Sequence, residues 1–388
     1  MNLELLAALR TPAGQDALAA AATVTGRDPL AAASSLRAKG VPADLAAAAL
    51  TQADLRTRAA AKFGAAAAEM FFTRAGFEQA TRAVVADRRA ARLRAAGVTS
   101  LADLGCGLGS DALAAARQGI RVHAVDADPL TAAMAAANAE AAGLADLVAV
   151  ECADATTVEV EKFDAVFADP ARRRAGRGRV FDPNAWSPSW DFIAALPRRV
   201  ENTVLKLAPG IDHALLPPGA EGEWVSVDGD LVEAAFWCGP LAEFARRASL
   251  LPADDQLHGS GVESAPVGPV GGYLYDPDPA VVRSHLVAEF AATVGGRLGD
   301  PEIAYVYTDE PVVTPYGRRL EITDVMPFSL KRLRALLRER GVGRVEIRKR
   351  GSALEPAQLR RDLRLSGPAA ANIVLTRVAG APAVLLCR

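Results

Sequence analysis

The chain has 388 residues, 51% hydrophobic and 23% charged, and its formal net charge is −2. This length is sufficient for two or three domains with substantial cores, and the near-neutral charge excludes a chain that is basic throughout. The cysteines, Cys106, Cys152, Cys238 and Cys387, form no CxxC pair. We therefore expect neither a metal site nor a disulfide framework, and a reducing compartment fits this pattern.

Neither a signal peptide nor a membrane span is predicted. The N-terminal stretch MNLELLAALRTPAGQDALAA has no basic segment before an apolar core, which a signal peptide would need. Apolar runs stay well below the roughly 18 residues of a membrane span. We therefore expect a cytoplasmic protein without membrane contact.

Four regions follow one another along the chain. Residues 1–95 are Ala-rich, with Leu, Arg and Asp at helical spacing, which predicts a helical N-terminal region. Residues 96–255 alternate short apolar runs with helical stretches, which predicts a parallel sheet covered by helices; near its end, Asp228-Gly229 predicts a hairpin at the sheet edge. Residues 256–272 are rich in Gly, Pro and Ser and predict a linker, and residues 273–388 predict a small α+β domain.

The stretch LADLGCGLGSD joins the end of a predicted strand to the start of a helix. Its glycines, Gly105, Gly107 and Gly109, allow a sharp turn and a close approach of a ligand to the backbone. Their GxGxG spacing differs from the GxGxxG of the dinucleotide fingerprint. Asp103 precedes the turn, where a carboxylate suits a cationic ligand better than a pyrophosphate. Both features favour S-adenosylmethionine (SAM) over NAD.

Two further acids close the next predicted strands. Asp126, in VHAVDADP, is expected to accept hydrogen bonds from the ribose hydroxyls. Asp154, in VECADA, is expected to accept a bond from the adenine amino group. Acids at strand ends are also common turn formers, so each of them alone has a second interpretation. A glycine loop and three acids in order along one βαβ series are much more specific for a cofactor site than for an α/β core without a nucleotide.

These stretches, DLGCGLGSD, VDADP and ECADA, resemble class I SAM-dependent methyltransferases. Others resemble the bacterial members that carry a THUMP-like C-terminal domain: FTRAGFEQATRAVVADRRAAR, FADPARR, VLKLAPG, YLYDPDPAVVR and KRGSALEPAQLRRDLRLSG. The resemblance covers most of the chain from about residue 60. It implies an α/β fold with a Rossmann-like methyltransferase sheet, SAM as the cofactor and RNA as the substrate class.

The stretch FADPARRR resembles the Asp-Pro-Pro-aromatic turn that holds the target amine in many nucleic-acid methyltransferases. Asp169 and Pro170 are retained, whereas Ala171 and Arg172 replace the second proline and the aromatic residue. We predict Asp169 and Pro170 as the catalytic residues, because a carboxylate and a carbonyl accept the amine hydrogens and leave the nitrogen lone pair facing the methyl group. The alternative is an ordinary turn at the end of a strand.

Basic and aromatic residues around this turn are candidate substrate contacts. Arg172 and Arg173 begin an Arg-rich loop that we expect to contact phosphate, the alternative being a solvated loop. Lys206, on the next predicted strand, either faces the site or extends from the sheet edge. Three rings in the same region can replace the missing aromatic residue: Phe181, Trp186 and Trp190.

Methylation at a base carbon usually needs a cysteine nucleophile, and no cysteine lies near Pro170 or in the loop that follows. Cys238 is the one alternative, and its apolar strand predicts a core position instead.

The C-terminal part is locally basic. Residues 327–377 contain thirteen Lys or Arg and four Asp or Glu, a local charge of +9, so the rest of the chain carries −11. This asymmetry is typical of a surface that binds a polyanion, and an Arg-rich solvated face is the alternative.

The sequence thus favours a SAM-dependent methyltransferase that acts on structured RNA at a base amine. Two alternatives stay open. One is a methyltransferase of a small molecule or protein, which would lack a salt-sensitive affinity for RNA. The other is a non-catalytic SAM-binding RNA module, because Ala171 and Arg172 depart from the usual motif. An NAD-dependent oxidoreductase is disfavoured by the glycine spacing and by Asp103.

Overall fold

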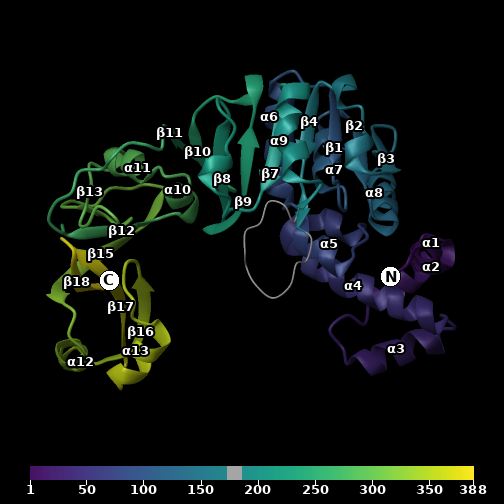
Figure 1. The fold of residues 1–388 in the computed structure, drawn as a ribbon. Coiled ribbons are helices and arrows are strands. Elements are labelled where there is room, and N and C mark those ends of the chain that lie inside the picture. The colour runs from purple at the N-terminus through teal and green to yellow at the C-terminus, as the bar shows by residue number, and fades with distance from the viewer. Residues whose placement is uncertain (173–185) are drawn as a thin grey trace. The chain divides into compact units, whose positions relative to one another are not determined.

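The computed structural model describes residues 1–172 and 186–388, and of residues 171 and 172 only the backbone (Figure 1). These residues form two compact units. Unit 1 contains Met1–Leu207, Ile211–Ala220 and Ala235–Glu243, and unit 2 contains Ala208–Gly210, Glu221–Ala234 and Phe244–Arg388.

Unit 1 begins with a series of helices: α1 (Leu3–Leu9), α2 (Pro12–Ala22), α3 (Pro29–Ala38), α4 (Ala43–Phe63), the short 3₁₀ helix η1 (Gly64–Ala68), α5 (Arg74–Gln79) and α6 (Ala83–Ala95). Side chains of Thr11 and Asp28 cap α2 and α3, whose first residues are prolines. Buried leucines and alanines of α1 to α4 and η1 form one core, which extends to Leu108 and Met134, so these helices pack on the part of the fold that follows. Helix α6 buries its apolar face in the core of the sheet.

The central sheet of unit 1 is parallel, in the order β7-β4-β1-β2-β3. Its strands are β1 (Ser100–Leu104), β2 (Arg121–Asp126), β3 (Val148–Cys152), β4 (Ala165–Ala168) and β7 (Thr203–Leu207). Crossover helices connect them: α7 (Ser110–Arg117), α8 (Pro129–Ala141) and α9 (Trp190–Arg199). Parallel strands have their carboxyl ends at one edge, and a ligand binds there in this class of sheet.

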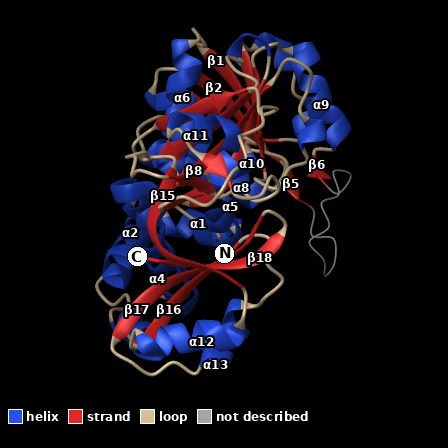
Figure 2. Ribbon diagram, turned by 90° about the vertical axis from the view of Figure 1, so that its left-hand side faces the viewer, coloured by secondary structure: helices blue, strands red, loops and turns tan. Residues whose placement is uncertain are grey.

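A two-stranded antiparallel ribbon extends from the end of β4. Strand β5 (Ala171–Arg172) pairs with β6 (Trp186–Ser187), with Arg172 opposite Trp186. Figure 2 shows the two strands side by side. The ribbon therefore places Trp186 next to the backbone of the predicted target turn.

Unit 2 contains the predicted hairpin at Asp228-Gly229. Both turn residues have positive φ, 53° and 82°, between β8 (Glu221–Val227) and β9 (Asp230–Trp237). The expected edge position is wrong, because β10 (Arg246–Leu251) pairs with β8 in parallel. Strand β11 (Asp255–Gly259) then pairs with β10 and takes up the first residues of the stretch expected as a linker.

The rest of unit 2 contains a seven-stranded sheet in the order β13-β14-β12-β15-β18-β17-β16. Its strands are β12 (Tyr273–Pro277), β13 (Arg297–Leu298), β14 (Val306–Thr308), β15 (Gly317–Pro327), β16 (Val342–Lys349), β17 (Ala369–Val378) and β18 (Ala381–Cys387). Its helices are α10 (Pro279–Arg283), α11 (Val287–Thr293), α12 (Leu330–Glu339) and α13 (Pro356–Leu363). Figure 2 shows α12 and α13 beside β16 and β17. The leucines of both helices are buried in one core with the sheet, and exposed basic residues lie on their other faces.

Within the described residues, no helix is long and apolar enough to cross a membrane. The same residues contain no group of three or more His, Cys, Asp or Glu side chains arranged to hold a metal ion.

Candidate cofactor and target site

The glycine loop connects β1 to α7 in a conformation that needs glycine. Gly105, Gly107 and Gly109 have φ of 86°, 57° and 82°, in the left-handed region that other residues rarely adopt. The amide of Gly105 donates to the carbonyl of Val125 at 2.9 Å, which fixes the turn against β2. A Cβ atom on Gly105 would lie only 2.8 Å from the carbonyl oxygen of Asp169. The predicted cofactor loop and target turn are therefore in direct contact.

Asp103 lies in β1, two residues before Gly105, and is fully buried. Neither of its carboxylate oxygens has a hydrogen-bond partner among the described residues. Burial raises the pKa of Asp103 well above its ordinary value, and the nearby carboxylates of Asp111 and Asp169 raise it further. An orphaned buried carboxyl is stabilised by a cationic partner, and the amino group of SAM is such a partner. The residues present thus fit the cofactor predicted for them.

Asp126 ends β2 and faces the same loop. Its Oδ2 accepts the amide hydrogen of Gly107 at 3.1 Å, and its Oδ1 accepts that of Asp128 at 3.0 Å. Burial raises its pKa, and these two hydrogen bonds oppose that rise. Each oxygen keeps further lone pairs, so an oriented carboxylate is available to ribose hydroxyls.

Asp154 has a different setting. It is exposed after β3, and its Oδ1 accepts both the amide of Thr156 at 2.8 Å and the hydroxyl of Thr156 at 2.7 Å. These bonds lower its pKa and cap the 3₁₀ turn Ala155–Thr157. The turn-forming role is therefore present, and the contact with adenine stays a prediction.

Two of the predicted residues meet at the target turn. The ammonium of Lys206, on β7, lies 2.5 Å from Oδ2 of Asp169. Asp169 directly follows β4, and its amide donates to the carbonyl of Leu104 at 3.1 Å. Of the two orientations considered for Lys206, the structure therefore has the one that faces the site. Pro170 follows Asp169 in the turn and is half-buried.

Matches to known families agree with this geometry. A model described as a methyltransferase domain matches residues 101–173, and one described as THUMP domain-like matches residues 317–388. A third, described as a domain of unknown function, matches residues 2–59. An uncharacterized SAM-dependent methyltransferase of Mycobacterium tuberculosis is 36% identical over 336 residues, which are 84% of this chain and 90% of the relative. The chain belongs to the class I SAM-dependent methyltransferases with a THUMP-like domain.

Two further likenesses concern either a part of the chain or the fold alone. A 23S rRNA (uracil-C5)-methyltransferase of Acidithiobacillus ferrooxidans is 37% identical over 103 residues, 25% of this chain and 23% of that protein. The crystal structure of a protein from Porphyromonas gingivalis W83, described as a candidate methyltransferase, aligns with a TM-score of 0.74 and 20% identity over 99% of this chain and 98% of that one. The second likeness concerns the fold alone. The predicted fold class, enzyme class and cofactor are confirmed: this methyltransferase uses SAM.

Part of the predicted substrate site lies outside the described residues of the methyltransferase. This applies to Arg173 and Phe181, while Arg172 is described only by its backbone. Of the other two candidate rings, Trp186 is buried and Trp190 half-buried. Their centroids are 5.5 Å apart at an interplanar angle of 84°, an edge-to-face pair. These rings are candidates for stacking beside the target turn.

The sequence interpretation missed several charged residues around the site. Arg89, on α6, forms a buried ion pair with Asp111 at the start of α7, and Thr81 donates to the other oxygen of Asp111 at 2.6 Å. The guanidinium of Arg89 also lies 4.6 Å from the ring centre of Phe167 on β4. Arg89 and Thr81 fall within the stretch that resembled the family, but the pairing joins segments distant in the chain.

Lys62, on α4, was also missed, because no motif surrounds it. Burial lowers its pKa to about 8, with further contributions from the positive charges of Lys206 and Arg82. Its ammonium donates to the carbonyl of Phe77 at 2.7 Å and to two more carbonyls at the end of α5. The N-terminal helices therefore reach the side of the site that Lys206 occupies.

Cys238 is an unsuitable nucleophile. It is buried at the end of β9, and burial raises its pKa to about 12. A nucleophilic cysteine must be available as a thiolate, which this environment disfavours. The core position expected for Cys238 is confirmed.

Proposed function

We propose that this methyltransferase acts on structured RNA and transfers the methyl group to a base amine. The observation that carries the proposal is the contact between the Asp169 carbonyl and the glycine loop. It means that a base amine held by the target turn would lie next to the cofactor. Bound SAM supplies an electrophilic methyl group, so the protein has mainly to position the nitrogen in line with it.

The residues of the target turn suit this task. Lys206 occupies Oδ2 of Asp169, which orients the carboxylate and leaves Oδ1 as an acceptor for one amine hydrogen. Carbonyl oxygens of the turn can accept the second hydrogen, so that the nitrogen lone pair faces the methyl group. The new C–N bond would form as the bond between the methyl group and the sulfur of SAM breaks, with S-adenosylhomocysteine as the leaving group. The nitrogen would take up the positive charge that the sulfur loses, and its surplus proton could pass to Asp169 or to water.

The C-terminal unit supports RNA as the substrate class. Its matched THUMP-like region, residues 317–388, includes helices α12 and α13. Basic side chains are exposed on and around these helices: Lys331, Arg332, Arg338, Arg344, Arg360, Arg361 and Arg364. A concentration of positive charge on a chain of net charge −2 is what phosphate contacts require. The partial likeness to a 23S rRNA methyltransferase points in the same direction.

The positions of the cysteines favour a base amine over a base carbon as the atom that is methylated. The methyltransferase has no cysteine in residues 169–190, and Cys238 is buried with a raised pKa. A carbon target would need a thiolate to activate the ring. An amine needs only the hydrogen-bond acceptors that Asp169 and its neighbours offer.

The test is transfer of labelled methyl from SAM to total cellular RNA, with Asp169→Ala as the paired control. We expect label in RNA with the wild-type protein and its loss in the variant, while both bind SAM. Label in proteins or small molecules instead would favour the second substrate class. SAM binding without any transfer would favour a non-catalytic module.

A further inference from the structure

A short segment outside the helices and sheets, residues 69–73, joins the first helices to α5. We call it the brace. Several of its backbone N–H and C=O groups form hydrogen bonds with side chains and not with a neighbouring strand. Gln52, on α4, accepts the amide hydrogen of Phe72 at 2.9 Å and donates to its carbonyl at 2.7 Å. A primary amide offers the same donor and acceptor as a peptide group, so this pairing satisfies the buried backbone.

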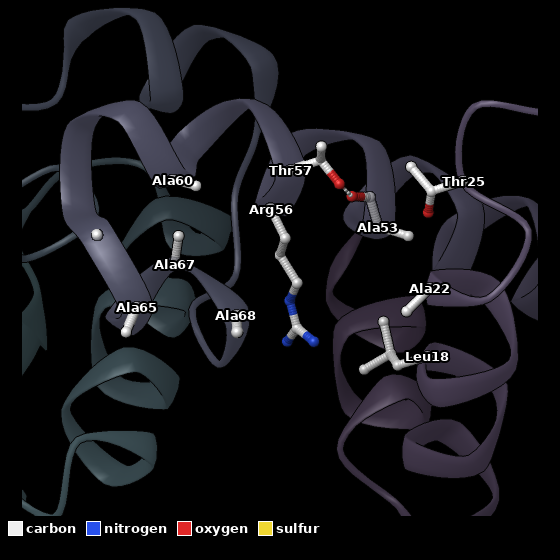
Figure 3. A pocket seen from close by; sticks show the side chains of 11 residues that line it. Leu18, Ala22, Thr25, Ala53, Arg56, Thr57, Ala60, Ala65, Ala67 and Ala68 are labelled. Carbon is white, nitrogen blue, oxygen red and sulfur yellow. Dashed lines mark hydrogen bonds between the residues drawn. The ribbon is translucent and has the colours of Figure 1, made fainter.

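The start of the brace is held by Arg56. Its Nε donates to the carbonyl of Met70 at 2.9 Å, and its Nη2 donates to that of Glu69 at 3.2 Å. Figure 3 shows the side chain of Arg56 extending among the alanines that line a pocket of about 330 Å³ between α2, α4 and η1. The brace is thus fixed to the N-terminal helices through two side chains of α4.

Asn138, on α8, fixes the brace from the other side. It is buried, its Oδ1 accepts the amide hydrogen of Phe71 at 2.7 Å, and its Nδ2 donates to the carbonyl of Phe71 at 3.2 Å. The same Nδ2 donates to the carbonyl of Leu108 at 3.0 Å. Leu108 lies in the glycine loop, between Gly107 and Gly109. One side chain therefore connects the brace to the cofactor loop.

The side chain of Leu108 is held by the segment that follows the brace. A Cβ atom on Gly76, in α5, would lie 2.9 Å from Cγ and Cδ2 of Leu108. Figure 1 places α5 beside the end of the sheet that carries this loop. Leu108 is therefore restrained at its carbonyl by Asn138 and at its side chain by α5.

We propose that Asn138 is a positioning residue for SAM binding, and that through it the affinity for SAM depends on the N-terminal helices. Gly107 and Gly109 flank Leu108 in left-handed conformations. Glycines have many accessible conformations, and ordering them on ligand binding costs conformational entropy. A loop already held at Leu108 avoids that cost, which is how preorganisation increases affinity.

The test compares two buried amides that hold the same brace. Asn138→Leu removes the bonds to Phe71 and Leu108, whereas Gln52→Met removes two bonds to Phe72 and touches no residue of the glycine loop. Both replacements nearly conserve side-chain volume and leave buried backbone groups unpaired, so both should lower the melting temperature. The readout that separates them is the Kd for SAM, measured by calorimetry on the full chain without RNA.

We expect Asn138→Leu to raise the Kd for SAM about tenfold or more, and Gln52→Met to change it by less than about twofold. In turnover, Asn138→Leu should raise the KM for SAM and leave kcat at saturating SAM nearly unchanged, because the target turn is intact. Equal effects of the two variants on Kd would reduce Asn138 to a general structural role and overturn the proposal, as would an unchanged Kd in Asn138→Leu.

If Asn138→Leu does not fold, Gly76→Ala decides the question. Its new methyl group would lie 2.9 Å from Cγ and Cδ2 of Leu108 and 2.8 Å from Oγ1 of Thr73, so it displaces the Leu108 side chain while Asn138 itself is not replaced. A Kd for SAM raised severalfold in a folded Gly76→Ala protein supports the dependence on this restraint, and a wild-type Kd contradicts it. Both experiments are independent of the proposed RNA substrate, so failure of that proposal would be seen separately.

Discussion

The Lys206 ammonium and the Asp169 carboxylate form an ion pair of 2.5 Å at the carboxyl edge of the sheet. The two residues are 37 positions apart: Asp169 directly follows β4 and Lys206 lies on β7, and the two strands are neighbours in the sheet. The side chain of Lys206 is 12% exposed and that of Asp169 is 33% exposed, so the carboxylate is the more accessible partner. This arrangement holds the proposed acceptor in place while it stays open to a substrate.

Removing the lysine should therefore impair methyl transfer more than SAM binding. We expect Lys206→Met to lower kcat/KM for RNA by about tenfold to a hundredfold, since a misoriented acceptor loses the in-line geometry. The Kd for SAM should stay within about threefold, because the ion pair of Lys206 is made with the target turn. Lys162→Met is the control, as Lys162 pairs with Glu159 at the exposed surface. Equal losses in the two variants would contradict a role of Lys206 at the site.

Binding of SAM should release protons from the protein. Burial raises the pKa of Asp103 well above its ordinary value in the absence of a ligand, which favours the protonated carboxyl. A nearby cation favours the ionised form and lowers the pKa, and the proton then leaves. Calorimetry of SAM binding in two buffers of different ionisation enthalpy measures this release.

Two variants show which carboxyl group releases the proton. Asp103→Asn should remove most of the buffer dependence and weaken SAM binding, whereas Asp154→Asn, at an exposed turn, should leave the proton release as it is. A wild-type enthalpy that is the same in both buffers would show that Asp103 does not change its protonation on binding.

Only one thiol of the native protein should react readily with a thiol reagent at pH 8. Cys152 is exposed, whereas Cys106, Cys238 and Cys387 are buried with raised pKa values. Because the thiolate is the reactive form, burial and a raised pKa both slow labelling. Peptide mapping after labelling identifies the site. In parallel, Cys238→Ser should retain methyl transfer to RNA; its complete loss would point to a carbon target.

The affinity for RNA should fall with salt, and neutralising α12 should reduce that dependence. Arg332 and Arg338 are exposed on this helix. Each phosphate contact removed should lower the slope of log K against log salt by about 0.7, the value for single strands. Filter binding of Arg332→Ala/Arg338→Ala at several salt concentrations measures the slope. Arg27→Ala, exposed in the loop between α2 and α3, is the control and should behave as wild type.

Much of the site could be predicted because its elements are local in the sequence. Gly105, Gly107 and Gly109 follow directly on Asp103, and the left-handed backbone of the loop requires glycine. Asp126 and Asp169 each come at the end of a strand. In a parallel sheet every such position lies at one edge, so their approach to the loop could be expected before any coordinates were known.

Asp154 shows the limit of that reasoning. Its position after β3 was predicted, but its carboxylate also caps a turn through Thr156, two residues away. A strand-end acid has both options, and the sequence pattern alone does not separate them. The hairpin at Asp228 was likewise foreseen from its turn residues, whereas its place inside a sheet depended on β10.

The sequence by itself determined the fold class, the glycine loop and the positions of the acids around it, because strand periodicity, glycine spacing and strand ends are properties of neighbouring residues. Only the tertiary structure decided that Lys206 faces Asp169, that Arg89 pairs with Asp111, and that Asn138 joins the brace to Leu108. Each of these contacts connects residues that are at least 20 positions apart. Such contacts depend on how the helices and strands pack, because a buried polar group can pair only with a group that the packing places beside it.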